Sequence, residues 1–260
     1  MSYDVAATIV TYSSDIDDVA KAVESCRQTS LNVFVQLVDN CSPGDYFEEL
    51  RRSVDVPVLR SDANRGFGYG HNIGFRHAPP SRYYLVLNPD VEIHRGALET
   101  MVGYLDEHTD VGLMSPRVLN PDGTQQYLNK RNPTVFDMLA RRFLPGSVKR
   151  LGWVRRRMDH YVMRDRGYDA VTPVRYMTGC FMLFRRSALR QTSLFDERFF
   201  MYLEDADITR RVRNVAQAVY FPHASITHKW SRGSHRSWKL TWVTVQSAVR
   251  YFNKWGWKLL

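Results

Sequence analysis

Strand-like and helix-like segments alternate along the first half of the chain, and this alternation constrains the fold more than any other feature. Short apolar runs predict buried strands at 4–12, 32–40, 56–61, 83–91 and 111–119. Helical spacing of apolar residues appears at 17–28, 44–53 and 95–108, and a glycine-rich stretch is expected to open a helix through Phe75. Such alternation predicts an α/β fold with a doubly wound, mostly parallel central sheet flanked by helices.

The second half is less regular. Residues 122–127 resemble a turn or hairpin tip, and 130–170 combine helical pieces with loop. A strand running into a helix is expected at 176–189, and another strand at 218–228. The final residues, from 236, predict a helical tail in which aromatic and basic side chains alternate.

The composition is that of an ordinary globular chain, with 260 residues, 44% hydrophobic and 24% charged. Its three cysteines are far apart and match no zinc spacing, which favours a reducing compartment. The N-terminus lacks the basic and apolar regions of a signal peptide, and no window is apolar enough to span a bilayer. We therefore expect a cytoplasmic protein.

The net charge of +9 favours anionic partners, namely nucleic acid, nucleotide diphosphates or an anionic membrane. Eleven basic residues lie between 130 and 166: Lys130, Arg131, Arg141, Arg142, Lys149, Arg150, Arg155, Arg156, Arg157, Arg164 and Arg166. A merely solvated surface is the simplest alternative. No RRM, KH or helix-turn-helix signature accompanies the charge, so we expect no nucleic-acid partner.

The stretch "NRGFGYGHNIG" (residues 64–74) resembles a dinucleotide-binding fingerprint, and Asp90 follows at about the spacing of a ribose-binding acid. That fingerprint belongs at the first strand-to-helix turn, however, and two strands and two helices precede it here. A different pattern fits better. Polar residues follow three predicted strands, at Asp39-Asn40, at the 64–74 loop and at Asn88-Pro89-Asp90. Ligands of open α/β sheets bind at such strand ends, so one ligand contacting all three is expected.

Six segments, taken in order, resemble family 2 glycosyltransferases of the GT-A fold, and in particular the rhamnosyltransferases that build bacterial surface polysaccharides. They are "VTYSSD", "LVDNCSPGD", "NRGFGYGHNIG", "LVLNPDV", "MTGCFMLFRR" and "FFMYLEDADITRRVR". The resemblance implies a GT-A domain over 1–235, with a nucleotide-sugar half (1–125), an acceptor half (126–235) that contains a basic insertion (130–170), and a tail at 236–260.

The implied activity is inverting transfer of L-rhamnose from dTDP-L-rhamnose to a glycan or lipid-linked acceptor. A UDP-sugar donor is the alternative within the class. Two other classes are a basic nucleic-acid-binding module and a sugar-nucleotide pyrophosphorylase. The latter needs a glycine-rich, lysine-bearing loop on the first strand, which "VTYSSD" lacks.

The resemblance also assigns donor-site residues. Asp39 matches the acid that binds the nucleobase, with Thr11, Tyr12 and Asn40 beside it. Five further residues are expected to contact the nucleotide sugar: Asn64, Arg65, Gly66, Gly68 and Asn72, with Arg65 able to pair with a phosphate.

The Asn88-Pro89-Asp90 turn occupies the family's metal-binding Asp-x-Asp position. Asp90 would bind Mg²⁺ or Mn²⁺ and thereby neutralise the leaving diphosphate, with His228 completing the metal shell. Asn88 is a neutral donor where the motif has a second acid, so weak metal affinity is expected.

The "LEDAD" segment resembles the family's Glu-Asp motif. An inverting transferase needs one carboxylate to deprotonate the acceptor, and we assign Asp205 as that base, with Glu204 orienting the acceptor or the base. Asp207 is expected to pair with Arg210 or Arg211 on the helix surface. Thr178, Gly179 and Cys180 are expected on the acceptor side.

A lipid-linked acceptor would present its sugar at a membrane. The basic stretch and the Trp- and Tyr-rich tail therefore predict peripheral attachment to the inner face of the plasma membrane, since such residues favour an anionic headgroup region.

Overall fold

The structure, a computed structural model, describes residues 2–230 and 238–260, and the side chains of Arg142 and Phe143 are also outside the description. The expected boundary between 235 and 236 lies outside the described residues. The strands are β1 (Tyr3–Thr11), β2 (Val33–Asp39), β3 (Val58–Arg60), β4 (Ser81–Leu87), β5 (Val91–Ile93), β6 (Val111–Leu119), β7 (Thr172–Pro173), β8 (Phe181–Arg185) and β9 (Gln217–His228).

Ten α-helices and one 3₁₀ helix are described. They are α1 (Ile16–Arg27), α2 (Tyr46–Ser53), α3 (Phe67–His77), α4 (Ala97–Glu107), α5 (Val135–Phe143), α6 (Gly146–Lys149), α7 (Gly152–Tyr161), η1 (Arg164–Arg166), α8 (Arg186–Gln191), α9 (Glu204–Val212) and α10 (Trp238–Trp255).

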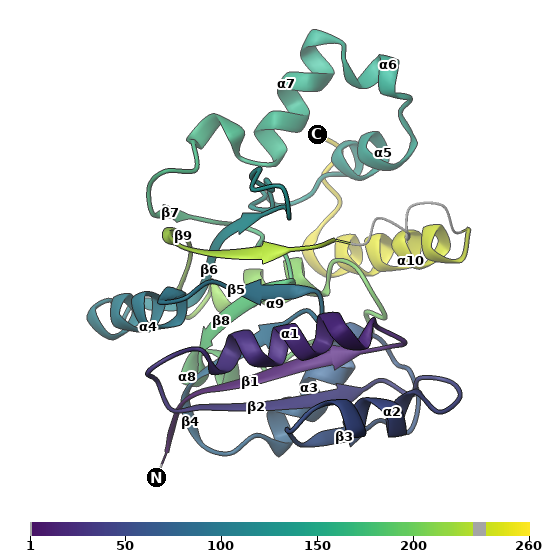
Figure 1. The fold of residues 1–260 in the computed structure, drawn as a ribbon. Coiled ribbons are helices and arrows are strands. Elements are labelled where there is room, and N and C mark those ends of the chain that lie inside the picture. Colours follow the sequence, from purple (N-terminus) through teal and green to yellow (C-terminus); the bar gives the residue numbers. More distant parts are fainter. Residues whose placement is uncertain (1, 231–237) are drawn as a thin grey trace.

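All nine strands form one sheet, in the order β3-β2-β1-β4-β8-β6-β9-β5, with β7 paired to β9 (Figure 1). The first four are parallel, as the βα alternation predicts, and β6 is parallel to β9. Strand β8 enters antiparallel between β4 and β6. Because β8 is antiparallel to both of these neighbours, β6 keeps the direction of the parallel series, as the alternation predicts, and the inserted β8 makes the sheet mixed.

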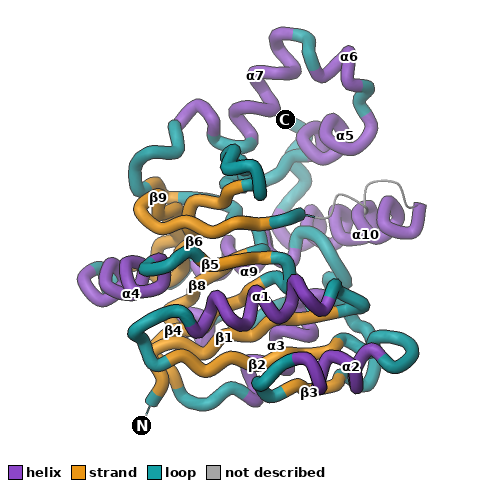
Figure 2. Tube along the Cα trace, viewed as in Figure 1, coloured by secondary structure: helices purple, strands orange, loops and turns teal. Residues whose placement is uncertain are grey.

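Helices cover both faces of the sheet (Figure 2). The alternation of buried side chains along β1 shows why. Val5, Ala7 and Ile9 point into a core shared with α1, α2 and α4, whereas Ala6 points into a core shared with α3, α8 and α9. Successive residues of a strand face opposite sides, and both sides are buried here.

The last helix packs on the body of the protein. Tyr251 and Phe252 of α10 are buried in a third core with Tyr176, Leu203 and Ala206. The residues after α10 return to the start of α5, where the Val135 and Phe136 amides donate to the carbonyls of Lys258 and Leu259. In the described ranges, no helix is both long and apolar enough to cross a membrane.

Candidate active site

The carboxyl ends of β1, β2 and β3 bring the expected base-binding residues together. In the sheet register, Thr11 lies opposite Asp39, and Asp39 lies opposite Arg60. The Asp39 carboxylate is fully buried, accepts hydrogen bonds from the Ser42 amide and hydroxyl, and lies 3.9 Å from Arg60 Nε. Tyr12, by contrast, is 53% exposed. The strand ends thus carry both a fixed, buried carboxylate and an exposed aromatic side chain.

The glycine-rich loop is held to the second strand end by Asn40. Its Nδ2 donates to Asn64 Oδ1 and to the Gly66 carbonyl, both at 3.0 Å. Gly66 has φ of 101°, and a Cβ there would lie 1.8 Å from the Phe200 carbonyl oxygen. Only glycine allows this approach, which also lets the Phe67 amide donate to Phe200 at 3.0 Å. The loop therefore fixes the segment that leads into α9.

Three residues of the loop, Asn72, Gly68 and Arg65, have partners within the protein. Asn72 uses both amide atoms on the 195–197 segment, with 2.9 Å bonds to the Phe195 backbone and to Glu197. Gly68 lies against the Phe195 side chain, where a Cβ would be 2.7 Å away. Arg65 is exposed and pairs with Asp62 at 2.9 Å. In the structure, Asn72 and Gly68 pack against the 195–197 segment. Arg65 forms an ion pair with Asp62, and a phosphate bound by Arg65 would have to displace Asp62.

The Asn88-Pro89-Asp90 turn is joined to the last strand by the β5–β9 pairing. Val91 lies opposite His228, and the Lys229 amide donates to the Asp90 carbonyl at 3.0 Å. This register brings His228 Nε2 to 3.5 Å from Asp90 Oδ1. The side chain of His228 is buried.

Gln126 fixes the imidazole of His228. Gln126 Nε2 donates to the carbonyl of His228 at 2.7 Å and to Asn120 Oδ1 at 2.9 Å, so Oε1 is the atom 3.0 Å from His228 Nδ1. Nδ1 must then be the donor, which leaves the Nε2 lone pair facing the Asp90 carboxylate in the neutral tautomer. Two electron-rich groups so arranged fit a divalent cation, and an oriented second nitrogen is typical of metal-binding histidines.

Asn88 begins the same turn and carries an amide oxygen, and its own backbone amide donates to the Cys180 carbonyl at 2.9 Å. Among the residues that the structure describes, no group of three or more His, Cys, Asp or Glu is arranged so that it could hold a metal ion. A cation held by Asp90, His228 and Asn88 would thus need further oxygen ligands from the diphosphate and from water.

Two adjacent carboxylates begin α9. The chain enters the helix through left-handed residues, Tyr202 at φ 70° and Leu203 at φ 66°, and strained backbone of this kind concentrates at functional sites. Asp205 accepts from the Ala206 amide at 2.9 Å and from the Gly179 amide at 3.1 Å. Glu204 is buried, and its Oε2 has no hydrogen-bond partner among the described residues.

Burial raises the pKa of both carboxyls. The pKa of Glu204 is held well above its ordinary value by burial and by the neighbouring Asp205. The pKa of Asp205 is raised by burial, and the Lys130 charge, the two backbone amides and Tyr176 oppose this rise. The environment of the pair is therefore asymmetric, because the Lys130 charge and two backbone hydrogen bonds favour the ionised form of Asp205.

The consecutive residues Gly179 and Cys180 link the Asp205 carboxylate to the turn that contains Asn88 and Asp90. Gly179 donates to Asp205, and Cys180 accepts from Asn88. The Cys180 thiol is buried, which raises its pKa to about 12, and the charges of Asp90 and Asp205 both add to this effect. Cys180 thus lies between the turn that would hold the diphosphate and the carboxylate that would act as base.

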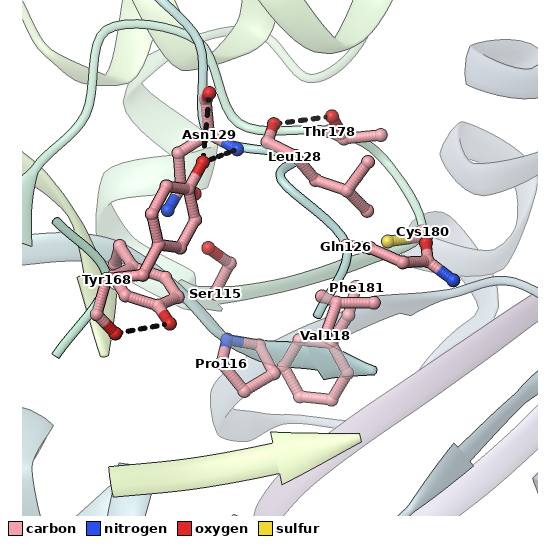
Figure 3. A pocket seen from close by; sticks show the side chains of 11 residues that line it. Ser115, Pro116, Val118, Gln126, Leu128, Asn129, Tyr168, Thr178, Cys180 and Phe181 are labelled. Carbon is pink, nitrogen blue, oxygen red and sulfur yellow. Dashed lines mark hydrogen bonds between the residues drawn. The ribbon is translucent and has the colours of Figure 1, made fainter. Parts of the chain in front are cut away.

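Thr178 donates from its hydroxyl to the Leu128 carbonyl at 2.8 Å and lines a small cavity with Cys180 (Figure 3). The cavity measures only about 10 Å³, which is room for about one water molecule. This cavity is too small to hold a sugar.

Asp207 is not on the helix surface as expected. It is fully buried and pairs with Arg211 at 2.8 Å, while Lys254 and the indole of Trp255 in α10 contact its other oxygen at 2.8 Å. These contacts tie α10 to the helix that carries Glu204 and Asp205.

Sequence reasoning misses Lys130, Gln126 and Ser42 as site residues. Lys130 stands first in a basic run whose simplest interpretation is a solvated surface, and yet it is buried beside Tyr176. No local pattern marks Lys130 and Gln126, because their partners Tyr176 and His228 are distant in sequence. Ser42, by contrast, lies only three residues after its partner Asp39.

A model of glycosyl transferase family 2 matches residues 7–193. The chain is 28% identical over 222 residues to N-acetylglucosaminyl-diphospho-decaprenol L-rhamnosyltransferase of Mycobacterium tuberculosis, covering 80% of this chain and 70% of the relative. It is also 28% identical over 218 residues to the low-salt glycan biosynthesis hexosyltransferase Agl10 of Haloferax volcanii, covering 81% and 62%.

Solved structures with the same GT-A fold include GalNAc-T7 with UDP, GalNAc and Mn²⁺ (TM-score 0.68, 15% identity) and the mannosyltransferase PcManGT of Pyrobaculum calidifontis with GDP-Man and Mn²⁺ (0.64, 15%). TarS of S. aureus with UDP-GlcNAc is similar at a TM-score of 0.58 and 16% identity. These matches cover 96–97% of this chain but only 48%, 65% and 67% of the respective neighbours.

Proposed function

The chain belongs to glycosyltransferase family 2, and from that premise we propose that it transfers L-rhamnose from dTDP-L-rhamnose to a glycan or lipid-linked acceptor, with inversion at the anomeric carbon. The donor sugar and the lipid-linked acceptor are supported by the relative named as a rhamnosyltransferase acting on a diphospho-decaprenol. A UDP-sugar is the second candidate donor, since TarS was crystallised with UDP-GlcNAc.

One observation carries the mechanism: residues 179 and 180 hydrogen-bond to the Asp205 carboxylate and to the Asn88 turn, respectively. Asp205 is our proposed general base. It takes the proton of the acceptor hydroxyl as that oxygen attacks the anomeric carbon, and the nucleoside diphosphate leaves with the electron pair of the glycosidic bond. Glu204, with the higher pKa, is protonated and can donate a hydrogen bond to the acceptor.

For the donor, we propose that Asp39, Thr11, Tyr12 and Asn40 surround the nucleobase, and that Asn64, Arg65 and Gly66 lie along the phosphates. Asp90, His228 and Asn88 would hold Mg²⁺ or Mn²⁺. The bound cation would neutralise the charge that develops on the leaving diphosphate.

We further propose that the protein works at the cytoplasmic face of the membrane, where a lipid-linked acceptor would present its sugar. The exposed side chains of α10 support this. Trp238, Trp242, Val245 and Val249 follow helical spacing, and the two tryptophans are 87% and 64% exposed.

Thermal shift with a panel of nucleotide sugars tests the donor assignment. With Mg²⁺ or Mn²⁺ present, dTDP-L-rhamnose should raise the melting temperature, whereas UDP- and GDP-sugars should leave it unchanged. A shift seen only with UDP ligands would instead identify a UDP-sugar, the second candidate, as the donor. A panel without any shift, together with no sugar transfer to lipid-linked acceptors, would contradict the proposed function.

A further inference from the structure

Lys130 is buried and held in place, unlike the exposed lysines of the chain. Its backbone pairs with that of Tyr176 through two hydrogen bonds of 2.9 and 3.0 Å. Its Nζ lies 4.3 Å from the centroid of the Tyr176 ring, a cation–π distance. The ammonium is thus fixed between the start of the basic stretch and the segment that leads into β8.

The charged and titratable groups around this ammonium come from several elements. They are Glu204 and Asp205 of α9, Tyr176 and Cys180 before β8, and Arg141 of α5. Tyr161 of α7 and Tyr251 of α10 lie near enough to Asp205 to interact with its charge. Two of the groups around the ammonium are carboxyls, and both lie near enough to Lys130 to interact electrostatically with it. Burial, and then the Arg141 charge, lower the pKa of Lys130 to about 8, so it is still mainly protonated at neutral pH.

The carboxyls of Asp205 and Glu204 receive unequal numbers of hydrogen bonds. Asp205 accepts two backbone hydrogen bonds, whereas Glu204 Oε2 has no hydrogen-bond partner within the described part of the chain. A single buried cation cannot compensate two buried anions at adjacent residues, because desolvation and mutual repulsion oppose the second charge. Ionisation of one carboxyl beside Lys130 is therefore the arrangement that this environment favours.

We propose that Lys130 is a positioning residue for the transfer reaction: its ammonium fixes Asp205 as the ionised carboxyl and leaves Glu204 protonated. The cation thereby keeps the base ready at neutral pH without touching the donor or the acceptor. This inference rests on the proposed function, in which Asp205 accepts the acceptor's proton.

The pH profile of turnover tests this role. In the wild type, kcat should rise with pH as Asp205 ionises. Lys130→Met removes the cation, so the pKa of Asp205 should rise. The part of the profile in which kcat rises with pH, the acidic limb, should then move to higher pH by on the order of one unit. Lys130→Arg keeps the charge and should leave the limb near its wild-type position. KM for the donor should change little in either variant.

Arg156→Met is the matched control, because it removes one exposed cation of α7 and should leave the limb unmoved. An unmoved limb in folded Lys130→Met would overturn the inference, as would a shift of equal size in the control. Lys130→Gln serves as a second neutral variant if Lys130→Met does not fold.

Infrared spectroscopy gives a test that needs no donor and no variant of Lys130. At neutral pH, the wild type should show one protonated carboxylic acid, and this signal should be absent from Glu204→Gln. A signal that persists in Glu204→Gln, or no protonated acid in the wild type, would contradict the inference. Because this measurement requires no sugar transfer, its failure is distinguishable from a failure of the proposed function.

Discussion

Asp205 combines the features that a general base needs: it is buried, held by two backbone amides, and adjacent to a carboxyl of higher pKa. Asp205→Asn keeps the shape and the acceptor capacity of one oxygen but cannot take a proton. Turnover should therefore fall by about 10²–10⁴-fold.

Donor binding measured by thermal shift should stay within a few-fold of wild type, because the base acts only on the acceptor. Retention of more than about a tenth of wild-type turnover would refute the assignment, and Glu204 would then be the next candidate base.

Asp90 and His228 are expected to act together, since the β5–β9 register brings them within 3.5 Å. Asp90→Ala and His228→Ala should each weaken Mn²⁺ binding, followed by electron paramagnetic resonance, by at least about tenfold. Nucleotide-sugar binding in Mg²⁺ should weaken in parallel.

Glu92→Ala is the control for these two variants, because Glu92 is an exposed carboxylate on the same strand as Val91 and Ile93. If Mn²⁺ binds Asp90→Ala and wild type equally, and EDTA leaves wild-type turnover intact, the metal site is wrongly assigned.

At the scale of elements, the glycine-rich loop and the segment before α9 depend on each other. Gly66→Ala should disturb this contact, since the added Cβ meets the Phe200 backbone and φ is positive. We expect a loss of about 1–3 kcal/mol in the free energy of unfolding, with reduced turnover.

Gly103→Ala provides the matched comparison for Gly66→Ala. Gly103 is an exposed residue of α4, and a Cβ added there would have no neighbour within 4 Å, so alanine should stabilise the helix by about 0.5–1 kcal/mol. If the two variants had the same melting temperature and the same denaturant midpoint, the loop contact would be unimportant for stability.

The elements that can be predicted are those with a local signal. Strands β1, β2, β4 and β6 are continuous apolar runs, and the helices between them show regular spacing, so each is expected close to its observed bounds. The insertion of β8 between β4 and β6 cannot be predicted, because strand order depends on contacts between distant residues. The three-residue β5 has no pattern of its own.

The candidate site likewise contains some residues that a local sequence motif identifies and others that it does not. Asp39, Asp90, Glu204 and Asp205 stand in recognisable motifs, whereas Lys130 acquires its surroundings only through the isolated pairing with Tyr176. The expectation of Asp207 at the surface is wrong, because the pattern of α9 alone does not reveal that α10 covers it.

At the scale of the whole molecule, the basic stretch is less uniform than its sequence suggests. Lys130 is buried, Arg131 pairs with Asp165 at 2.8 Å, and Arg157 pairs with Asp137 at 3.0 Å. Other members are exposed: Arg141, Arg150, Arg155, Arg156, Arg164 and Arg166. Part of the charge therefore stabilises the fold, and part remains available to an anionic surface.

The exposed stripe of α10 is where we expect bilayer contact. Trp238, Trp242, Val245 and Val249 give an apolar stripe, with the cations Lys239 and Arg250 exposed on the same helix. Helices with an apolar face and basic flanks lie in the interface of anionic bilayers, and tryptophan favours the headgroup level.

Sedimentation with vesicles measures this contact. The protein should pellet with anionic vesicles at low salt, remain in the supernatant with neutral vesicles, and be released at high salt, because the attraction is screened over about 8–10 Å at physiological ionic strength. Trp238→Ala combined with Trp242→Ala should abolish pelleting, whereas Trp257→Ala, which removes an exposed tryptophan beyond α10, should preserve it. Equal recovery in the supernatant with both vesicle types would contradict membrane attachment, and equal pelleting of the double variant would move the contact away from α10 to the basic residues of α5–α7.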